Sequence, residues 1–138
     1  MASIKRRSLR RGTMAVEAAI MMPVLVFMTL GLLEYGWIYM KSEQIANAAR
    51  HGARVGARID ATDPEVQLAV ADLMTKAGIV SYPTPTISHG PIPGTTQESL
   101  TVTVRVPFKN GPLDLLKIPF IPVPNNLQSS VTMAKEST

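Results

Sequence analysis

The longest apolar run of the chain, from Thr13 to Leu33, constrains its architecture most. It contains 21 residues, and Glu17 is the only charged one. A helix rises about 1.5 Å per residue, so the run is long enough to cross the roughly 30 Å hydrocarbon core of a bilayer. A charge and aromatic residues of the kind found at membrane interfaces follow it, namely Glu34, Tyr35, Trp37 and Tyr39. The sequence therefore predicts one membrane-spanning helix within residues 13–39.

The basic residues are concentrated before this run. The net charge is +4, yet five basic residues and no acidic one lie in the first dozen positions: Lys5, Arg6, Arg7, Arg10 and Arg11. The rest of the chain therefore carries one excess negative charge, which argues against a nucleic-acid-binding face. Basic residues favour the cytoplasmic side of a membrane, so we expect the N-terminus to be cytoplasmic and the C-terminal part to lie outside.

Two features of the run leave alternatives open. A cleavable secretory signal usually has an apolar region of about 7–15 residues and a small-residue cleavage site, and this run is longer and continues into Leu32–Tyr35 without such a site. Glu17 either lies near the interface, protonated or reaching toward water, or pairs with a cation when helices assemble. A carboxylate there costs about 2.5–3.5 kcal/mol on insertion scales, and pairing with a cation would offset this cost.

The residues around this run resemble a known family. A short basic leader ends in Gly12, a glutamate is the fifth residue after that glycine, and an apolar helix follows at once. This arrangement resembles the class III leader of type IV prepilins. Residues 12–54 are more closely similar to the TadE-like family of pilin-like proteins from tight-adherence (Flp-type) pilus systems. The segments that carry the similarity are Ala15–Ala19, Pro23–Leu25, Gly31–Gly36 and Ala46–Arg54, with a weaker likeness at Leu127–Met133.

The resemblance implies roles for three residues. A prepilin peptidase would cut between Gly12 and Thr13 on the cytoplasmic side. Glu17 would be the assembly carboxylate, which pairs with the freed N-terminal amine of a neighbouring subunit or helps to draw the subunit into the assembly. Ala18 departs from the pattern, because many major pilins of these systems have an aromatic residue after that glutamate.

A helical pattern continues beyond the span, from Ile38 to Ile59, and predicts a stalk helix over residues 40–60. Its apolar stripe consists largely of small residues and includes Gly52 and Gly56. Small side chains allow close helix packing, so the stripe either packs against another subunit or seats the sheet of its own subunit. Arg50, Arg54 and Arg58 form a row on the opposite side. We interpret this row as a solvated face, with contact to lipid phosphates or an acidic partner as the alternative.

The remainder, residues 61–138, predicts a small extracytoplasmic head. Asp63 is a helix N-cap, Pro64 suits the first helical position, and Gly78 ends a short helix. Clean alternation over Leu100–Phe108 predicts a strand with one apolar face, and Leu127–Met133 predicts a last strand antiparallel to it. Thr86–Ser88 is a possible edge strand, and the apolar stretch Ile118–Val123 suits covering the sheet or touching a partner.

Enzyme chemistry is not indicated. The chain has no cysteine and two histidines, which excludes thiolate metal sites and argues against a histidine cluster. No phosphate-binding loop, Gly-x-Ser-x-Gly motif or pair of poised carboxylates is present. The Ser88-His89 pair in a proline-rich segment is more typical of a surface than of catalysis. We therefore expect no enzymatic activity, no cofactor and no small-molecule substrate.

These observations predict an α+β, pilin-like membrane protein. It comprises a leader (1–12), a membrane-spanning helix (13–39), a stalk helix (40–60) and a head (61–138) with a small antiparallel sheet and one short helix. The expected function is that of a minor pilin or pseudopilin in the bacterial inner membrane, with a periplasmic head. Its partners would be the prepilin peptidase, other pilin-like subunits and the pilus assembly machinery. The alternatives are an uncleaved anchored accessory protein and a tethered binding module.

Overall fold

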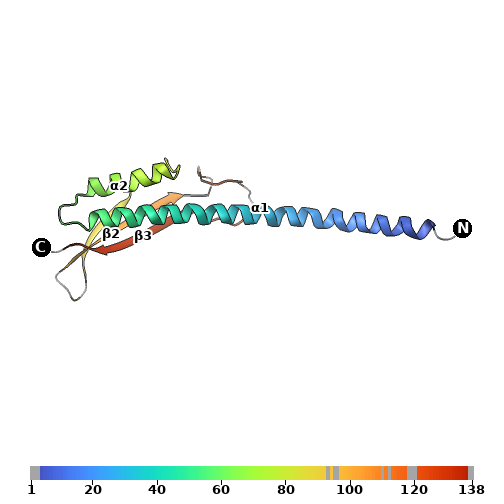
Figure 1. Cartoon of the computed structure of the whole chain (residues 1–138), viewed down its shortest axis with the longest axis horizontal. Coiled ribbons are helices and arrows are strands. Elements are labelled where there is room, and N and C mark those ends of the chain that lie inside the picture. Colours follow the sequence, from blue (N-terminus) through green and yellow to red (C-terminus); the bar gives the residue numbers. More distant parts are fainter. Residues whose placement is uncertain are drawn as a thin grey trace. The chain divides into compact units, whose positions relative to one another are not determined.

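The described residues form two helices and one three-stranded sheet (Figure 1). The computed structural model describes residues 4–92, 94, 97–109, 111, 113–117 and 121–136, with side chains described from residue 12 onward. Helix α1 spans Ile4–Gly56, and helix α2 spans Asp63–Lys76. The strands are β1 (Thr86–Pro91), β2 (Glu98–Pro107) and β3 (Asn126–Ala134). The predicted α+β class, with a long N-terminal apolar helix, is confirmed.

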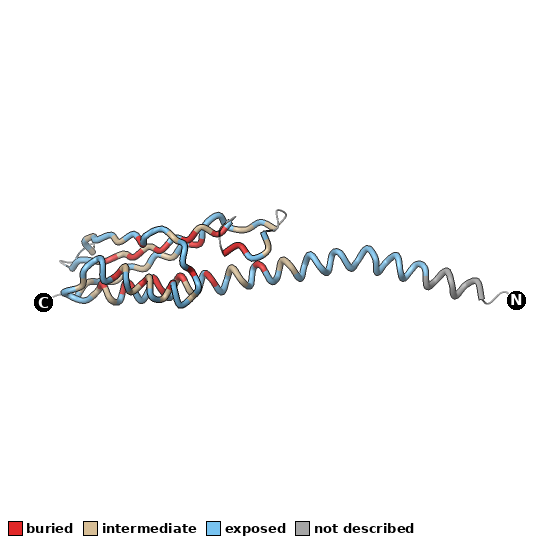
Figure 2. Tube along the Cα trace, turned by 90° about the horizontal axis from the view of Figure 1, so that it is seen from above, coloured by how far each residue is buried: buried red, intermediate tan, exposed pale blue. Residues whose placement is uncertain are grey.

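The chain divides into two compact units, Met1–Gly36 and Trp37–Thr138, which we call unit 1 and unit 2. Unit 1 contains the first part of α1, and the helix continues through Pro23. Unit 2 contains the rest of α1 together with α2 and the sheet. Residues 37–60, which include the predicted stalk helix, group with the predicted head residues 61–138 in unit 2. They do so because many small and apolar residues of this helical segment are buried there (Figure 2).

The sheet of unit 2 is an antiparallel meander with the order β1-β2-β3. Val102 in the central strand lies opposite Ile87 on one side and Val131 on the other. Every second residue of β2 is buried, as the alternation predicts: Leu100, Val102, Val104 and Val106, followed by Phe108 just after the strand. The strands predicted at Thr86–Ser88, Leu100–Phe108 and Leu127–Met133 are therefore all present.

The core of unit 2 lies between the two helices and this face of the sheet. Helix α1 contributes Ile45, Ala48, Ala49 and Ala53, and α2 contributes Val66, Val70 and Met74. The apolar stretch predicted at Ile118–Val123 is represented by Val123, which packs against the core, whereas residues 118–120 lie outside the described residues. Burying these side chains drives folding of a unit this small, because each of the larger ones, such as Ile45, Val70 and Met74, contributes on the order of 1.5–3 kcal/mol.

The ends of α2 follow local sequence rules. The N-cap is Thr62, one residue before the predicted Asp63, so Pro64 occupies the second helical position. This shift lets the backbone N–H of Thr62 donate to Oε2 of Glu65 at 3.1 Å, which is half of a capping box. At the other end Gly78 has φ 71°, a conformation that glycine adopts without strain. Helix α1 ends earlier than predicted, at Gly56, which places Arg58 in the following turn.

Candidate functional site

Residues 12–29 of α1 are all exposed, and most of their side chains are apolar. Ile20, Met21 and Met22 are consecutive residues, so they point about 100° apart around the helix, and all three are exposed. The most apolar part of this helix has none of its residues buried. Thr29 is polar, but its hydroxyl donates to the carbonyl oxygen of Leu25 at 2.8 Å and is therefore satisfied within the helix. By length and composition α1 is able to cross a membrane and to anchor the chain there.

The three residues of the predicted processing and assembly site lie on one stretch of unit 1. Gly12, Thr13 and Glu17 are all exposed, and a side chain added at Gly12 would meet no atom within 4 Å. Glu17 follows Thr13 by four residues and so lies about one turn further along the helix. It forms no ion pair with any side chain that the structure describes. The basic leader side chains Lys5–Arg11 lie outside that description, although the main chain is helical from Ile4.

The end of the apolar run differs from a simple membrane interface. Glu34 was expected as an interfacial charge, but its side chain is only 1% exposed. Trp37 is half-buried in unit 2, and its Nε1 donates to the carbonyl oxygen of Leu113 at 2.7 Å. Tyr35 and Tyr39 remain exposed, so they are the aromatic residues of this segment that are available to an interface.

Lys41 is a structural cation whose role the sequence analysis did not predict. Its side chain is 6% exposed, and Nζ donates to the carbonyl oxygen of Ala77, the C-cap of α2, at 2.7 Å. The same nitrogen lies 4.8 Å from the centre of the Trp37 ring. A cation at a helix C-terminus interacts favourably with the helix dipole. The spacing of Trp37 and Lys41 by four residues was a signal for this pair, because such residues meet on one helix face.

Gly52 and Gly56 face the core of their own subunit. A side chain at Gly52 would meet Val70 and Val66 of α2, and one at Gly56 would meet Leu100 of β2. Each glycine thus permits a close approach between α1 and its neighbours. The alternative in which the small-residue stripe seats the sheet of the same subunit accounts for both residues.

A shallow apolar groove of about 650 Å³ runs between α2 and the segment that precedes β1. Leu68 and Ala71 line one side, and Val80, Tyr82 and Pro85 line the other. Burial raises the pKa of the Tyr82 phenol above its ordinary value, because the apolar surroundings disfavour the charged form.

Residues suited to metal or acid–base chemistry do not converge in the described part of the chain, where no group of three such ligands occurs. His89 and Asp63 form a partly exposed pair, with His89 Nε2 3.0 Å from Oδ1 of Asp63. Ser88 and His89 are consecutive in β1, so their side chains point to opposite faces of the sheet and do not form a couple.

The apolar helix of unit 1 and the small antiparallel sheet of unit 2 define a pilin-like α+β protein. A family model described as "TadE-like protein" matches residues 12–54, which confirms the resemblance to the TadE-like family over that segment. That family is a structural, pilus-associated one, and the match covers 43 of the 138 residues of this chain. No curated protein and no solved structure matches the chain.

Proposed function

We propose that the protein is a minor pilin or pseudopilin of a tight-adherence (Flp-type) pilus. The observation that carries this proposal is the exposed apolar surface of residues 12–29, within a run where Glu17 is the only charge between Thr13 and Leu33. Such a surface requires lipid or other apolar helices around it. The protein resides in the bacterial inner membrane, with a cytoplasmic N-terminus and a periplasmic head.

Processing comes first in the proposed mechanism. The prepilin peptidase hydrolyses the Gly12–Thr13 bond and leaves a charged amine on Thr13. The absence of a side chain at Gly12, together with the open space around it, gives the peptidase access to this bond.

Assembly then exchanges lipid contacts for contacts between helices. The Glu17 carboxylate of one subunit pairs with the Thr13 amine of the next. Opposite charges attract far more strongly in a low-dielectric bundle than in water, so this pair favours the assembled state.

N-terminal mapping of membrane-extracted protein tests the processing step. Mass spectrometry of cells with the peptidase is expected to find Thr13 as the first residue, and cells without it should retain the leader. Gly12→Leu should block the cut, whereas Gly31→Leu, at another position of α1 with open space around it, should not. An intact leader in cells with active peptidase would refute processing.

Substitution of Glu17 tests the assembly step. Glu17→Gln keeps the shape of the side chain but removes its charge, so the protein should still insert in the membrane while filament formation falls sharply. Glu43→Gln, at an exposed carboxylate of α1 in unit 2, is the matched control and should leave filaments unchanged. Normal filament formation by the Glu17→Gln variant would contradict the assembly role of Glu17.

One observation favours an uncleaved accessory protein as the second candidate. The Gly12–Thr13 bond lies inside α1, which begins at Ile4, and a helical peptide bond must unwind before a peptidase can cut it. Immunodetection of the head in sheared filaments separates the two candidates: a pilin is recovered with the filaments, whereas an accessory protein stays with the membrane.

A further inference from the structure

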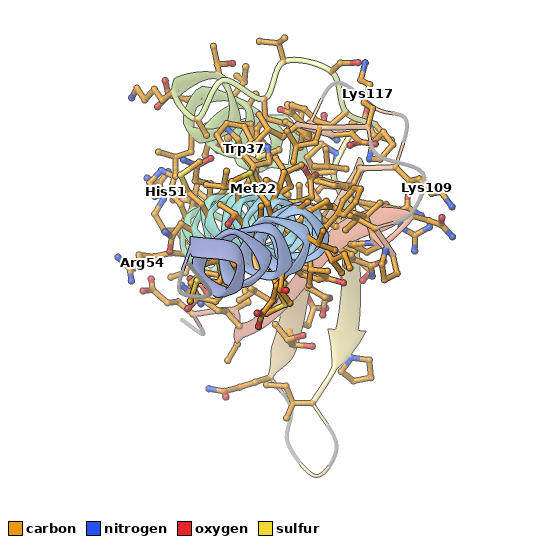
Figure 3. All side chains as sticks on the ribbon, turned by 90° about the vertical axis from the view of Figure 1, so that its right-hand side faces the viewer. Met22, Trp37, His51, Arg54, Lys109 and Lys117 are labelled. Carbon is orange, nitrogen blue, oxygen red and sulfur yellow. The ribbon has the colours of Figure 1, made fainter. Side chains whose placement is uncertain are left out.

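The exposed side of α1 in unit 2 carries cations that form no ion pair among the residues the structure describes. Arg50 and Arg54 are exposed and lie one helical turn apart, and Arg58 follows in the turn after the helix. We call these three residues the arginine face. None of them forms an ion pair with a carboxylate of the described residues, and Arg50 Nη1 donates instead to Oδ1 of Asn47 at 2.8 Å. Arg54 projects from α1 on the side away from the sheet (Figure 3).

Helix α2 carries the opposite charge on its exposed side. Glu65, Leu68 and Asp72 have helical spacings of three and four, so they share one face, which we call the acidic face. Leu68 is 70% exposed between the two acids. Glu65 accepts a hydrogen bond from the Thr62 backbone, and Asp72 pairs with Lys76 at 2.6 Å. Both partners of that ion pair are well exposed, so exchanging it for another costs little.

Unit 2 has nearly equal numbers of positive and negative side chains, and the two kinds are concentrated on different faces. It contains nine Lys or Arg and eight Asp or Glu residues, so two copies do not repel each other strongly through net charge. The arginine face and the acidic face lie on different helices of the same body. A contact that joins two different faces of identical subunits is heterologous, and it leaves a free face at each end for the next copy.

Lipid headgroups are a poorer partner for the arginine face. Arg50 follows Tyr39, the end of the predicted span, by eleven residues, which is about 16 Å of helix. Arg54 lies about 6 Å further along the helix. These distances exceed the headgroup layer of roughly 5–8 Å on each side of a bilayer. A partner that lies beside the head is therefore needed to contact the arginine face.

We propose that the arginine face of one copy binds the acidic face of α2 on a neighbouring copy. Arg50 and Arg54 face Glu65 and Asp72, and the exposed Leu68 supplies apolar contact between the acids. Arg58 lies beside Asp60, which limits its contribution. This contact rests on the proposed function and deepens it, since it joins the heads of neighbouring copies by a heterologous contact.

Cysteine crosslinking in membranes tests the contact directly, because the chain has no cysteine of its own. Two full-length copies with different tags are produced together, one with His51→Cys beside the arginines and one with Leu68→Cys. Oxidation should join the two tags. Arg50→Glu with Arg54→Glu in the first copy should lower the crosslinked fraction by about tenfold, since two attractive pairs become repulsive. Glu65→Lys with Asp72→Lys in the second copy should then restore it.

Matched controls make the result specific. Lys109 and Lys117 are exposed cations that project on the other side of the molecule from Arg54 (Figure 3), so Lys109→Glu with Lys117→Glu should leave the crosslink unchanged. Absence of the crosslink, or failure of the reversed acids to restore it, overturns the contact. Filaments that still form in that case keep the proposed function intact, whereas loss of filaments with Glu17→Gln tests that function independently.

Discussion

The two parts of α1 show how one helix serves two environments. In unit 1 its large apolar side chains are exposed and its glycines have open space around them. In unit 2 most of its small and apolar residues are buried, and its charged residues other than Lys41 are exposed. The contrast teaches that an unbroken exposed apolar surface along α1 belongs to the segment expected to contact lipid or sister helices, whereas exposed apolar residues in unit 2 are scattered. Four predictions test this contrast, from the largest expected effect to the smallest.

Phenylalanine truncation should affect the two units very differently. Phe108 is fully buried beside β2, so Phe108→Ala should destabilise unit 2 by about 3–5 kcal/mol. Phe27 is exposed in unit 1, so Phe27→Ala should leave the unfolding of unit 2 unchanged. Urea unfolding of the detergent-extracted chain measures both, and equal effects would contradict the assignment of the core.

A lysine placed on exposed valines should separate membrane surface from water-facing surface. Val24→Lys puts a charge in the apolar run and should weaken insertion by about 2.5–3.5 kcal/mol. Val80→Lys, at an even more exposed valine of unit 2, should not change membrane association. Carbonate extraction of membranes measures the bound fraction. A Val24→Lys protein that stays fully bound would argue against this segment as the span.

Enlarging glycines should distinguish close packing from open surface. Gly52→Leu forces a side chain against Val70 and Val66, and overpacking of this kind costs about 1–3 kcal/mol. Gly31→Leu in unit 1 should leave unit 2 as stable as before, because nothing lies within 4 Å of that site. Limited proteolysis of the head at rising temperature reports the difference. Crosslinking losses without any change in head stability would instead favour packing between subunits.

The smallest effect concerns the aromatic residues after the run. Trp37→Phe removes the hydrogen bond to Leu113 and should cost about 0.5–1.5 kcal/mol of unit 2 stability. Tyr39→Phe, at an exposed position, should change it by less than about 0.5 kcal/mol. Thermal unfolding of both variants gives the comparison. Unchanged stability of the Trp37→Phe variant would show that the hydrogen bond contributes little to the stability of unit 2.

Local sequence patterns predicted much of this fold. The alternation of β2 identified its buried face residue by residue, and the length of the apolar run identified a candidate span. The surroundings of Trp37, Lys41 and Gly52 could not be predicted, because their partners Leu113, Ala77 and Val70 are distant in sequence. A small-residue stripe suits packing within a subunit as well as between subunits, so the three-dimensional structure is needed to distinguish the two. The roles of Gly12, Thr13 and Glu17 depend on other molecules and stay predictions.

The hydrogen bonds of Trp37 and Lys41 have a mechanical consequence. They are made by the first turns of α1 in unit 2, before Ile45, the first fully buried apolar residue of the helix. Tension applied along the helix from its N-terminal side would therefore load the carbonyls of Leu113 and Ala77 first. These two hydrogen bonds would break first, while the pairing of β2 with β1 and β3 is kept. The head could then extend under a shearing force without unfolding of its sheet.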